Sequence, residues 1–214
     1  MKKRFLPRNF QILSLSLALS LALGLAAPAA AQDFSSFYVT PKVMSSYQKA
    51  EMNGGSEKGS VLGLGVSLGT DLSYSSSLPI RLETEYLYHG NQTFSVGNVN
   101  HDISAHTIMG NIFLDLQTDT EFTPYVGGGL GVAYLNDHVT SLAGDDTKDK
   151  RWNLAWNLGG GIAWGLSESL ALDLGYRYMD LGKTDGSRLA SQPTMAEADL
   201  TAHEFSLGLR ISGF

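Results

Sequence analysis

From Asp33 onward, the sequence is dominated by bulky apolar residues that alternate with small or polar ones. The clearest stretch runs from Trp152 to Leu166, where almost every second residue is Trp, Leu or Ile and the residues between them are Asn, Ala or Gly. A period of two puts successive side chains on opposite faces of an extended chain. The stretch is therefore predicted to be a strand with one apolar face.

Seven more segments of the sequence show the same alternation. They lie near residues 37–44, 62–69, 80–88, 107–116, 125–134, 170–178 and 204–211. The first of them is the weakest, because Pro41 inside it indicates a β-bulge or an irregular start. Helical spacing is nearly absent, so we predict an all-β fold of eight strands.

Eight such strands fit either a soluble sandwich or a membrane barrel, and the lengths of the connections separate the two. The predicted connections at 71–77, 118–121 and 167–169 are short, whereas those at 45–59, 90–102, 136–150 and 182–199 are long. A sandwich follows no such rule, whereas outer-membrane barrels alternate short turns with long outer loops. After residue 31, no apolar run approaches the ~20 residues of a membrane-spanning helix, so insertion would use strands. We predict an eight-stranded antiparallel transmembrane β-barrel with short periplasmic turns and four long extracellular loops.

Aromatic residues gather near the two ends of the predicted strands. Tyr86, Tyr88, Tyr134, Trp152, Tyr176 and Tyr178 fall near the long loops, and Phe122, Trp164 and Phe214 fall at the opposite ends. Tyr and Trp favour the two interfaces of a bilayer, because their rings are partly apolar and partly polar. The alternative is that these rings fill the core of a sandwich.

The first 31 residues are predicted to be a secretory signal peptide and not part of the fold. Basic residues at positions 2, 3, 4 and 8 precede a short apolar run at 12–25, and Ala29 and Ala31 form a small-residue cleavage site before Gln32. A retained membrane anchor is the alternative, but the run is shorter than the ~20 residues that cross a bilayer. The β-barrel domain is then assigned to residues 32–214.

The charge and composition of the chain narrow its chemistry. There are 15 Lys and Arg residues against 21 Asp and Glu, and removal of residues 1–31 leaves only 11 basic residues. Nucleic acid is therefore not an expected partner, because its phosphates are bound by clustered positive charge. The absence of Cys excludes disulfides, thiolate metal sites and cysteine nucleophiles.

Several segments resemble one known family of membrane proteins. They are 125–134 (YVGGGLGVAY), 159–164 (GGGIAW), 171–182 (ALDLGYRYMDLG), 81–86 (RLETEY) and Asn111. Together they resemble the opacity-type porins and related bacterial surface antigens, which are eight-stranded outer-membrane β-barrels. The resemblance implies a Gram-negative outer membrane, contact with its lipid and lipopolysaccharide, and variable surface loops with roles in adhesion, host interaction or envelope integrity.

The C-terminus departs from the pattern of this family. The terminal Phe of such barrels usually lies on the outward face of the last strand and helps the barrel-assembly machinery to recognise the chain. Here the outward residues, from Phe205 to Ile211, have odd numbers, whereas Phe214 has an even one. A bulge at Gly213 would restore the phase, because glycine tolerates the left-handed conformation, and a short unpaired tail is the alternative.

Charged residues recur on the predicted inward face of the strands. They are Lys42, Asp71, Arg81, Glu83, Glu85, Asp115, Asp173, Arg177, Glu204 and Arg210. The interior of an eight-stranded barrel is just wide enough for side chains, so charges there must pair or be costly. We predict a structural plug of ion pairs. An ion pathway is the alternative, although barrels with open aqueous channels usually have about 16–18 strands.

These features predict an outer-membrane surface protein with a structural, adhesive or host-interaction role through its long loops. A small-solute porin and, less favoured, a lipid-modifying enzyme are the alternatives. The segments His101–Ser104 and His203–Ser206 contain the His, Ser and acidic residues that such an enzyme needs. The spacing of three residues puts His203 and Ser206 on opposite faces of a strand. We therefore predict no catalytic residue. The glycine runs lie within strands and lack the helix of a nucleotide-binding loop, so no cofactor is expected.

The histidines suggest one further hypothesis. His89, His101, His106 and His138 lie near the predicted loop ends of the third, fourth and fifth strands, whereas His203 lies on the eighth. Neighbouring imidazoles could bind zinc or change charge between about pH 5 and 8. The alternative is that histidine is tolerated at a membrane interface because its ring is amphipathic.

Overall fold

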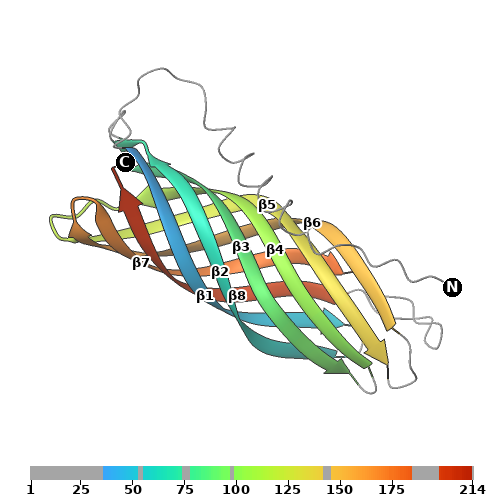
Figure 1. The fold of residues 1–214 in the computed structure, drawn as a ribbon. Coiled ribbons are helices and arrows are strands. Elements are labelled where there is room, and N and C mark those ends of the chain that lie inside the picture. Colours follow the sequence, from blue (N-terminus) through green and yellow to red (C-terminus); the bar gives the residue numbers. More distant parts are fainter. Residues whose placement is uncertain are drawn as a thin grey trace, which may run out of the picture. The chain divides into compact units, whose positions relative to one another are not determined.

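The computed structural model describes residues 36–52, 55–73, 78–96, 99–141, 146–184 and 198–213, which form one antiparallel sheet closed into a barrel (Figure 1). Its strands are β1 (Phe37–Met52), β2 (Gly55–Asp71), β3 (Ile80–Val96), β4 (Val99–Asp115), β5 (Phe122–Ser141), β6 (Asp146–Ser167), β7 (Leu170–Thr184) and β8 (Ala198–Ser212). Each strand pairs with the next in sequence and β8 pairs with β1, so the sheet has no free edge. The predicted eight-stranded barrel is confirmed. No helix in this part of the chain is long and apolar enough to span a membrane.

The strands run obliquely around the barrel. One row of directly opposed residues starts at Ile162 on β6, passes Leu174, Leu207, Val43, Leu64, Tyr88, His106 and Tyr134, and returns to β6 at Trp152. One circuit therefore shifts the register by the ten residues between positions 162 and 152. A stagger of this kind accompanies tilted strands and, in an eight-stranded barrel, an interior that side chains fill.

The outward residues of the strands form an apolar wall. On β6, Leu154 is 74% exposed and Leu158 is 65% exposed, whereas Ala155 and Asn157 are buried inside. The alternation predicted from the sequence is confirmed here, with bulky residues outside and small or polar residues inside. A continuous apolar surface of this extent suits contact with lipid and not with water.

Glycines on the inward face make room for large neighbours. A Cβ atom at Gly161 would lie 2.5 Å from the hydroxyl oxygen of Tyr125, and one at Gly129 would overlap the side chain of Asn111. The glycine-rich segments of β5 and β6 are therefore required by interior packing.

The connections differ between the two ends of the barrel, which we name the turn end and the loop end. At the turn end, the strands are joined by residues 72–79, 116–121 and 168–169. At the loop end, three strand pairs stay paired almost to their tips, so most of 45–59, 90–102 and 136–150 is strand and not loop. Alternation did not reveal these extensions, because backbone pairing beyond a membrane needs no apolar face. The fourth long connection contains residues 185–197, which lie outside the described residues.

The irregularity predicted at Pro41 is a gap in one ladder and not a bulge. Val39 opposes Ile211 and Lys42 opposes Gly208, which is one unbroken register between β1 and β8. Residues 40 and 41 have no partner in this ladder, so the missing N–H of proline costs no strand pairing there.

The predicted signal peptide, residues 1–31, and Phe214 lie outside the described residues. Gly213 follows the last residue of β8 with a φ of 76°, which is the left-handed conformation that glycine tolerates.

Single cysteines can report which end of the barrel faces outside, because the chain has no native Cys. We expect Asp199→Cys, at the loop end, to react with a membrane-impermeant maleimide on intact cells. Asp119→Cys, at the turn end, should react only after the outer membrane is permeabilised. Both native side chains are exposed, so a difference in labelling between the two variants reports which end of the barrel the reagent can reach. Labelling of Asp119→Cys on sealed cells would show that the turn end, and not the loop end, faces outside.

Candidate functional site

The barrel interior has two layers of different chemistry. Toward the turn end it is lined by charged and hydroxyl-bearing side chains, and toward the loop end it is lined by apolar ones. The charged layer collects most of the residues that the sequence predicted as an interior network.

Arg81 on β3 lies in the charged layer near the turn end and is 1% exposed. Its Nε donates a hydrogen bond to Asp115 on β4 at 2.7 Å, and its Nη1 donates to Glu83 at 3.0 Å. The rings of Phe113 and Tyr125 lie with their centroids 5.0 and 4.9 Å from its Cζ. The guanidinium is thus held by two carboxylates and by cation–π contacts, and it connects β3, β4 and β5.

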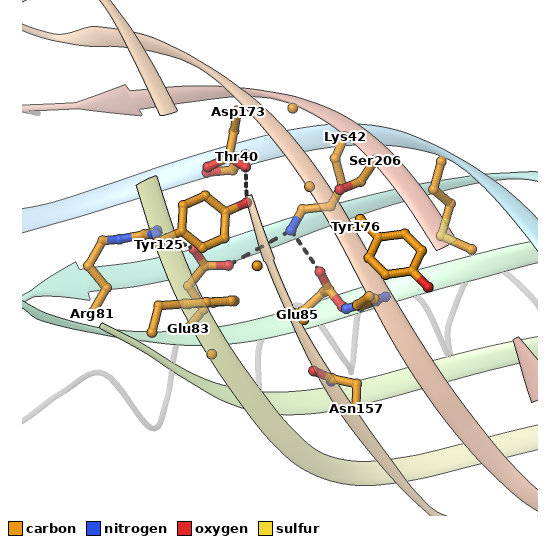
Figure 2. A pocket seen from close by; sticks show the side chains of 18 of the residues that line it. Thr40, Lys42, Arg81, Glu83, Glu85, Tyr125, Asn157, Asp173, Tyr176 and Ser206 are labelled. Carbon is orange, nitrogen blue, oxygen red and sulfur yellow. Dashed lines mark hydrogen bonds and ion pairs between the residues drawn. The ribbon is translucent and has the colours of Figure 1, made fainter. Parts of the chain in front are cut away.

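Lys42 on β1 continues the network toward the loop end (Figure 2). Its Nζ donates to Glu85 at 2.7 Å and lies 3.8 Å from Oε2 of Glu83. The Tyr38 hydroxyl donates to Oε1 of Glu83 at 2.8 Å. Glu83 and Glu85 are two residues apart on β3 and therefore share its inward face, where one lysine reaches both.

Arg177 on β7 joins β3 to β8 across the interior. Its Nη1 donates to Glu85 at 2.6 Å, and its Nε donates to Glu204 at 2.7 Å. His89 lies on the other side of Glu204, with Nδ1 3.2 Å from Oε1, and its Nε2 is 3.3 Å from the hydroxyl oxygen of Thr107. These contacts form one axial network, which consists of Asp115, Arg81, Glu83, Lys42, Glu85, Arg177, Glu204 and His89.

Two of the predicted interior charges form a pair of their own. Arg210 on β8 donates to Asp173 on β7, and the Tyr125 hydroxyl donates to the same carboxylate. Asp71 is different, because its Oδ1 accepts a hydrogen bond from the backbone N–H of Ser73 at 2.9 Å. The prediction that Asp71 joins the interior network is wrong, since β2 ends at this residue and its carboxylate binds the turn instead.

A cavity of about 50 Å³ lies among Lys42, Glu83, Glu85, Asn157 and Arg177. A buried water needs roughly 10–15 Å³ of such space, so the cavity has room for a few waters and none for a substrate. The layer brings together four cations and five carboxylates. The cations and carboxylates of the charged layer therefore neutralise one another.

The apolar layer closes the interior on the loop-end side of these charges. It consists of Ala105, Met109, Ala133, Leu135, Ala155, Met179, Leu181, Leu200 and Ala202, all 2% exposed or less. An ion in this layer would lose its water without gaining a ligand. In the sequence, this layer corresponds to a reversal of the pattern found elsewhere, in which apolar residues face outward. Here the apolar Met179 and Leu181 face inward, and the polar Asp180 between them faces outward.

The predicted histidines whose side chains the structure describes do not form one cluster. His89 is fully buried beside Glu204, so its assignment to an outer rim is wrong. The reason is its odd position on β3, which places it on the inward face. His106 and His138 occupy outward positions on β4 and β5, and the His101 side chain lies outside the described residues. Among the side chains that the structure describes, no group of three or more His, Asp or Glu could hold a metal ion.

Two histidines take part in matched aromatic clusters on the outer wall. The hydroxyl oxygen of Tyr86 is 2.9 Å from Nδ1 of His106, and the Tyr88 ring lies 4.9 Å from the same imidazole between centroids. Across the barrel, Tyr176, Tyr178 and His203 repeat this arrangement, with corresponding distances of 2.8 and 5.4 Å. The sequence carries this arrangement twice: Tyr-x-Tyr on β3 is followed by Ala-His on β4, and Tyr-x-Tyr on β7 is followed by Ala-His on β8. The repeat is not visible when each segment is inspected alone. Rings of this kind anchor a barrel at a bilayer interface.

The pair that resembles catalytic residues is separated by the barrel wall. His203 is exposed on the outer wall, whereas Ser206 lines the interior cavity. The two side chains therefore cannot act on one bound substrate.

Comparison with known proteins gives a family and several relatives. The sequence matches the family described as outer membrane protein beta-barrel domain over residues 16–212. Outer membrane protein PagN of Salmonella typhimurium is 28% identical over 171 residues, which cover 70% of this chain and 72% of PagN. The crystal structure of Neisserial surface protein A has a TM-score of 0.58 at 22% identity, and the match covers 82% of this chain and 96% of that one. Ail, the attachment invasion locus protein of Yersinia pestis, was solved with the heparin analogue sucrose octasulfate; its TM-score is 0.52 at 11% identity, with 82% and 99% covered.

Removal of the Arg177 side chain should strongly destabilise the barrel. Arg177→Ala removes the guanidinium from two buried carboxylates and leaves Glu85 with Lys42 alone and Glu204 with His89 alone. Breaking a buried ion pair from one side costs about 3–5 kcal/mol. The measurement is urea unfolding of the refolded protein in vesicles. Lys183→Ala is the matched control, because Lys183 and Asp199 form an exposed pair at 3.6 Å that should contribute at most about 1 kcal/mol. Equal stability of the two variants would contradict the structural role of the network.

The two filled layers also predict that the barrel conducts poorly. We expect the refolded protein in planar bilayers to show small or absent conductance, because ions must cross the apolar layer. A steady, large current from single chains would show that the interior opens.

Proposed function

We propose that this chain, which belongs to the outer membrane protein beta-barrel domain family, is an adhesive surface protein that binds a partner through its loop end. The chain is an outer-membrane β-barrel, and its apolar wall is the part that meets lipid. The binding surface is then what extends beyond that wall.

The length of the strands beyond the membrane wall carries this proposal. A transmembrane strand needs about 9–11 residues, whereas β5 has 20 residues and β6 has 22. Aromatic contacts at Trp164 and Trp152 mark the two edges of the wall on β6. The strand continues beyond Trp152 from Arg151 to Asp146, paired with β5. A hydrogen-bonded ribbon of this kind offers a rigid binding surface outside the membrane.

The loop-end segments also carry most of the charged residues that lie outside the interior network. The basic residues of these segments are Lys49, Lys58, Lys148, Lys150, Arg151, Lys183 and Arg188, interspersed with Asp and Glu. Basic side chains recognise sulfate and carboxylate groups. Since Ail was solved with a heparin analogue, an anionic glycan is the partner class to test first.

The other functions weighed from the sequence have less support. The apolar layer argues against a small-solute porin, and the separation of His203 from Ser206 argues against a lipid-modifying enzyme of that type. The sequence pattern of residues 1–31 supports export with a cleaved signal peptide.

Shortening one ribbon tests the adhesive function. Residues 137–149 are replaced by an Asn-Gly turn, which suits a two-residue hairpin and joins the directly opposed Asn136 and Lys150. Cells that display the native chain should adhere to cultured epithelial cells above an empty-vector background, with soluble heparin as competitor. The shortened variant should lose that adherence while it still folds and reaches the surface. Asp119→Asn at the turn end is the matched control and should adhere normally.

The proposal fails if the native chain confers no adherence above background. It also fails if adherence survives separate shortening of each of the three ribbons. Adherence that heparin does not reduce would reject the glycan as partner and leave a protein ligand.

A further inference from the structure

His89 lies inside the barrel at the point where β3 separates from β2. Gly63 and His89 form the last pair between these strands toward the loop end, and residues 55–62 and 90–96 continue without pairing to each other. Just past His89, β3 shifts its register against β4 and stays paired with it to the tip. Residues 90–96 and 99–103 are named the β3–β4 ribbon. A contact made by the His89 side chain therefore acts on the base of this ribbon.

The charged layer has one carboxylate more than it has cations. The cations are Lys42, Arg81, Arg177 and Arg210, and the carboxylates are Glu83, Glu85, Asp115, Asp173 and Glu204. A buried negative charge without compensation is costly, because few waters reach it. A bound proton supplies the missing positive charge.

The carboxylates of the layer are poor places for that proton. Each of the five lies against at least one Arg or Lys side chain. A proton on any of them would remove the charge from an existing ion pair. A proton on His89 would instead add an ion pair, because the oxygen of Glu204 that points away from Arg177 lies next to the imidazole.

The surroundings of His89 suit a charged imidazole. The ring is fully buried, with Nδ1 3.2 Å from Oε1 of Glu204 and Nε2 3.3 Å from the hydroxyl oxygen of Thr107. A protonated imidazole donates from both nitrogens, and here each nitrogen faces an oxygen. Glu204 comes from β8 and Thr107 from β4, so the ring joins β3 to both strands.

The other groups near His89 leave Glu204 as its ionic partner. The charged and titratable side chains around the ring are Glu204 from β8, Arg177 from β7, Lys42 from β1, Glu85 on β3 and, on the outer wall, Tyr88 and His106. Arg177 and Lys42 lie on the far side of the carboxylates that they bind. Near this level, β2, β5 and β6 present the uncharged Gly63, Ala133 and Ala155.

We propose that His89 carries the proton that balances the charged layer, and that its ion pair with Glu204 holds the base of the β3–β4 ribbon against β8. Loss of this proton at higher pH leaves one carboxylate uncompensated and weakens the contact. The ribbon is therefore held more firmly in mildly acidic surroundings than in alkaline ones. This sign is the reverse of that for a carboxylate paired with Arg, whose contribution is lost as the pH falls. The inference does not depend on the adhesive function.

The first test is a nuclear magnetic resonance titration of the histidine rings in the refolded protein. At about pH 7, we expect the His89 ring to give the signal of an imidazolium. In Glu204→Gln, which leaves four cations against four carboxylates, the same ring should be neutral. A neutral His89 in the native protein at this pH would overturn the charge assignment, and that result does not depend on the folding of any variant.

The second test is hydrogen exchange of the backbone amides in the β3–β4 ribbon. The paired residues 136–141 and 146–150 of β5 and β6 are the internal reference, because base-catalysed exchange accelerates equally in both. Between about pH 6 and pH 8.5, we expect the relative protection of the β3–β4 ribbon to fall about tenfold. In His89→Gln, which has no proton to lose, relative protection should stay constant. His203→Gln is the matched control, because this exposed ring bonds Tyr176 on the outer wall, and it should keep the native fall.

Two further outcomes would overturn the role of the ion pair. Constant relative protection in the native protein, while the His89 ring loses its proton, would show that the ion pair does not hold the ribbon. A fall that persists in His89→Gln would assign the pH dependence to another group. If His89→Gln does not fold, the native titration and the native exchange profile still decide the result.

Discussion

The narrow interior of an eight-stranded barrel leaves no place where an inward side chain can avoid its neighbours from other strands. Four cations are accommodated there because carboxylates from other strands lie against them, as Glu85 on β3 and Glu204 on β8 do against Arg177 on β7. The glycine-rich inner faces of β5 and β6 follow from the same lack of space. So does the apolar outer wall, because polar groups gathered inside leave large hydrophobic residues for the surface that meets lipid.

Much of the fold was predictable because alternation is a local property of each strand. The stretch from Trp152 to Leu166 carries its own inward and outward faces, whatever lies beside it. The number of strands and the unequal connections then lead to a closed antiparallel barrel. The loop end was less predictable, because the ribbons there are held by backbone pairing, and their polar side chains leave no periodic signal.

The interior partners were not predictable, because they depend on the register between strands. Asp71 on β2 lies directly opposite Arg81 on β3, yet the Arg81 guanidinium donates its hydrogen bond to Asp115 on β4. His89 lies in a segment rich in outward aromatics, but its odd position places it beside Glu204 from β8. Inward or outward direction could be assigned from each strand alone, whereas the choice among several inward partners requires the three-dimensional arrangement.

The Arg177 bridge has a consequence for the order of assembly. Glu85 and Arg177 are 92 residues apart in sequence, and Glu204 lies on the strand that pairs with β1 to close the sheet. The three charges therefore meet only when the ends of the sheet meet, and an open sheet in the bilayer would expose them to hydrocarbon. Closure and membrane crossing must consequently advance together, with the ion pairs forming late in folding. A chain stalled before β8 has paired would be held back at the membrane surface by its own unmatched charges.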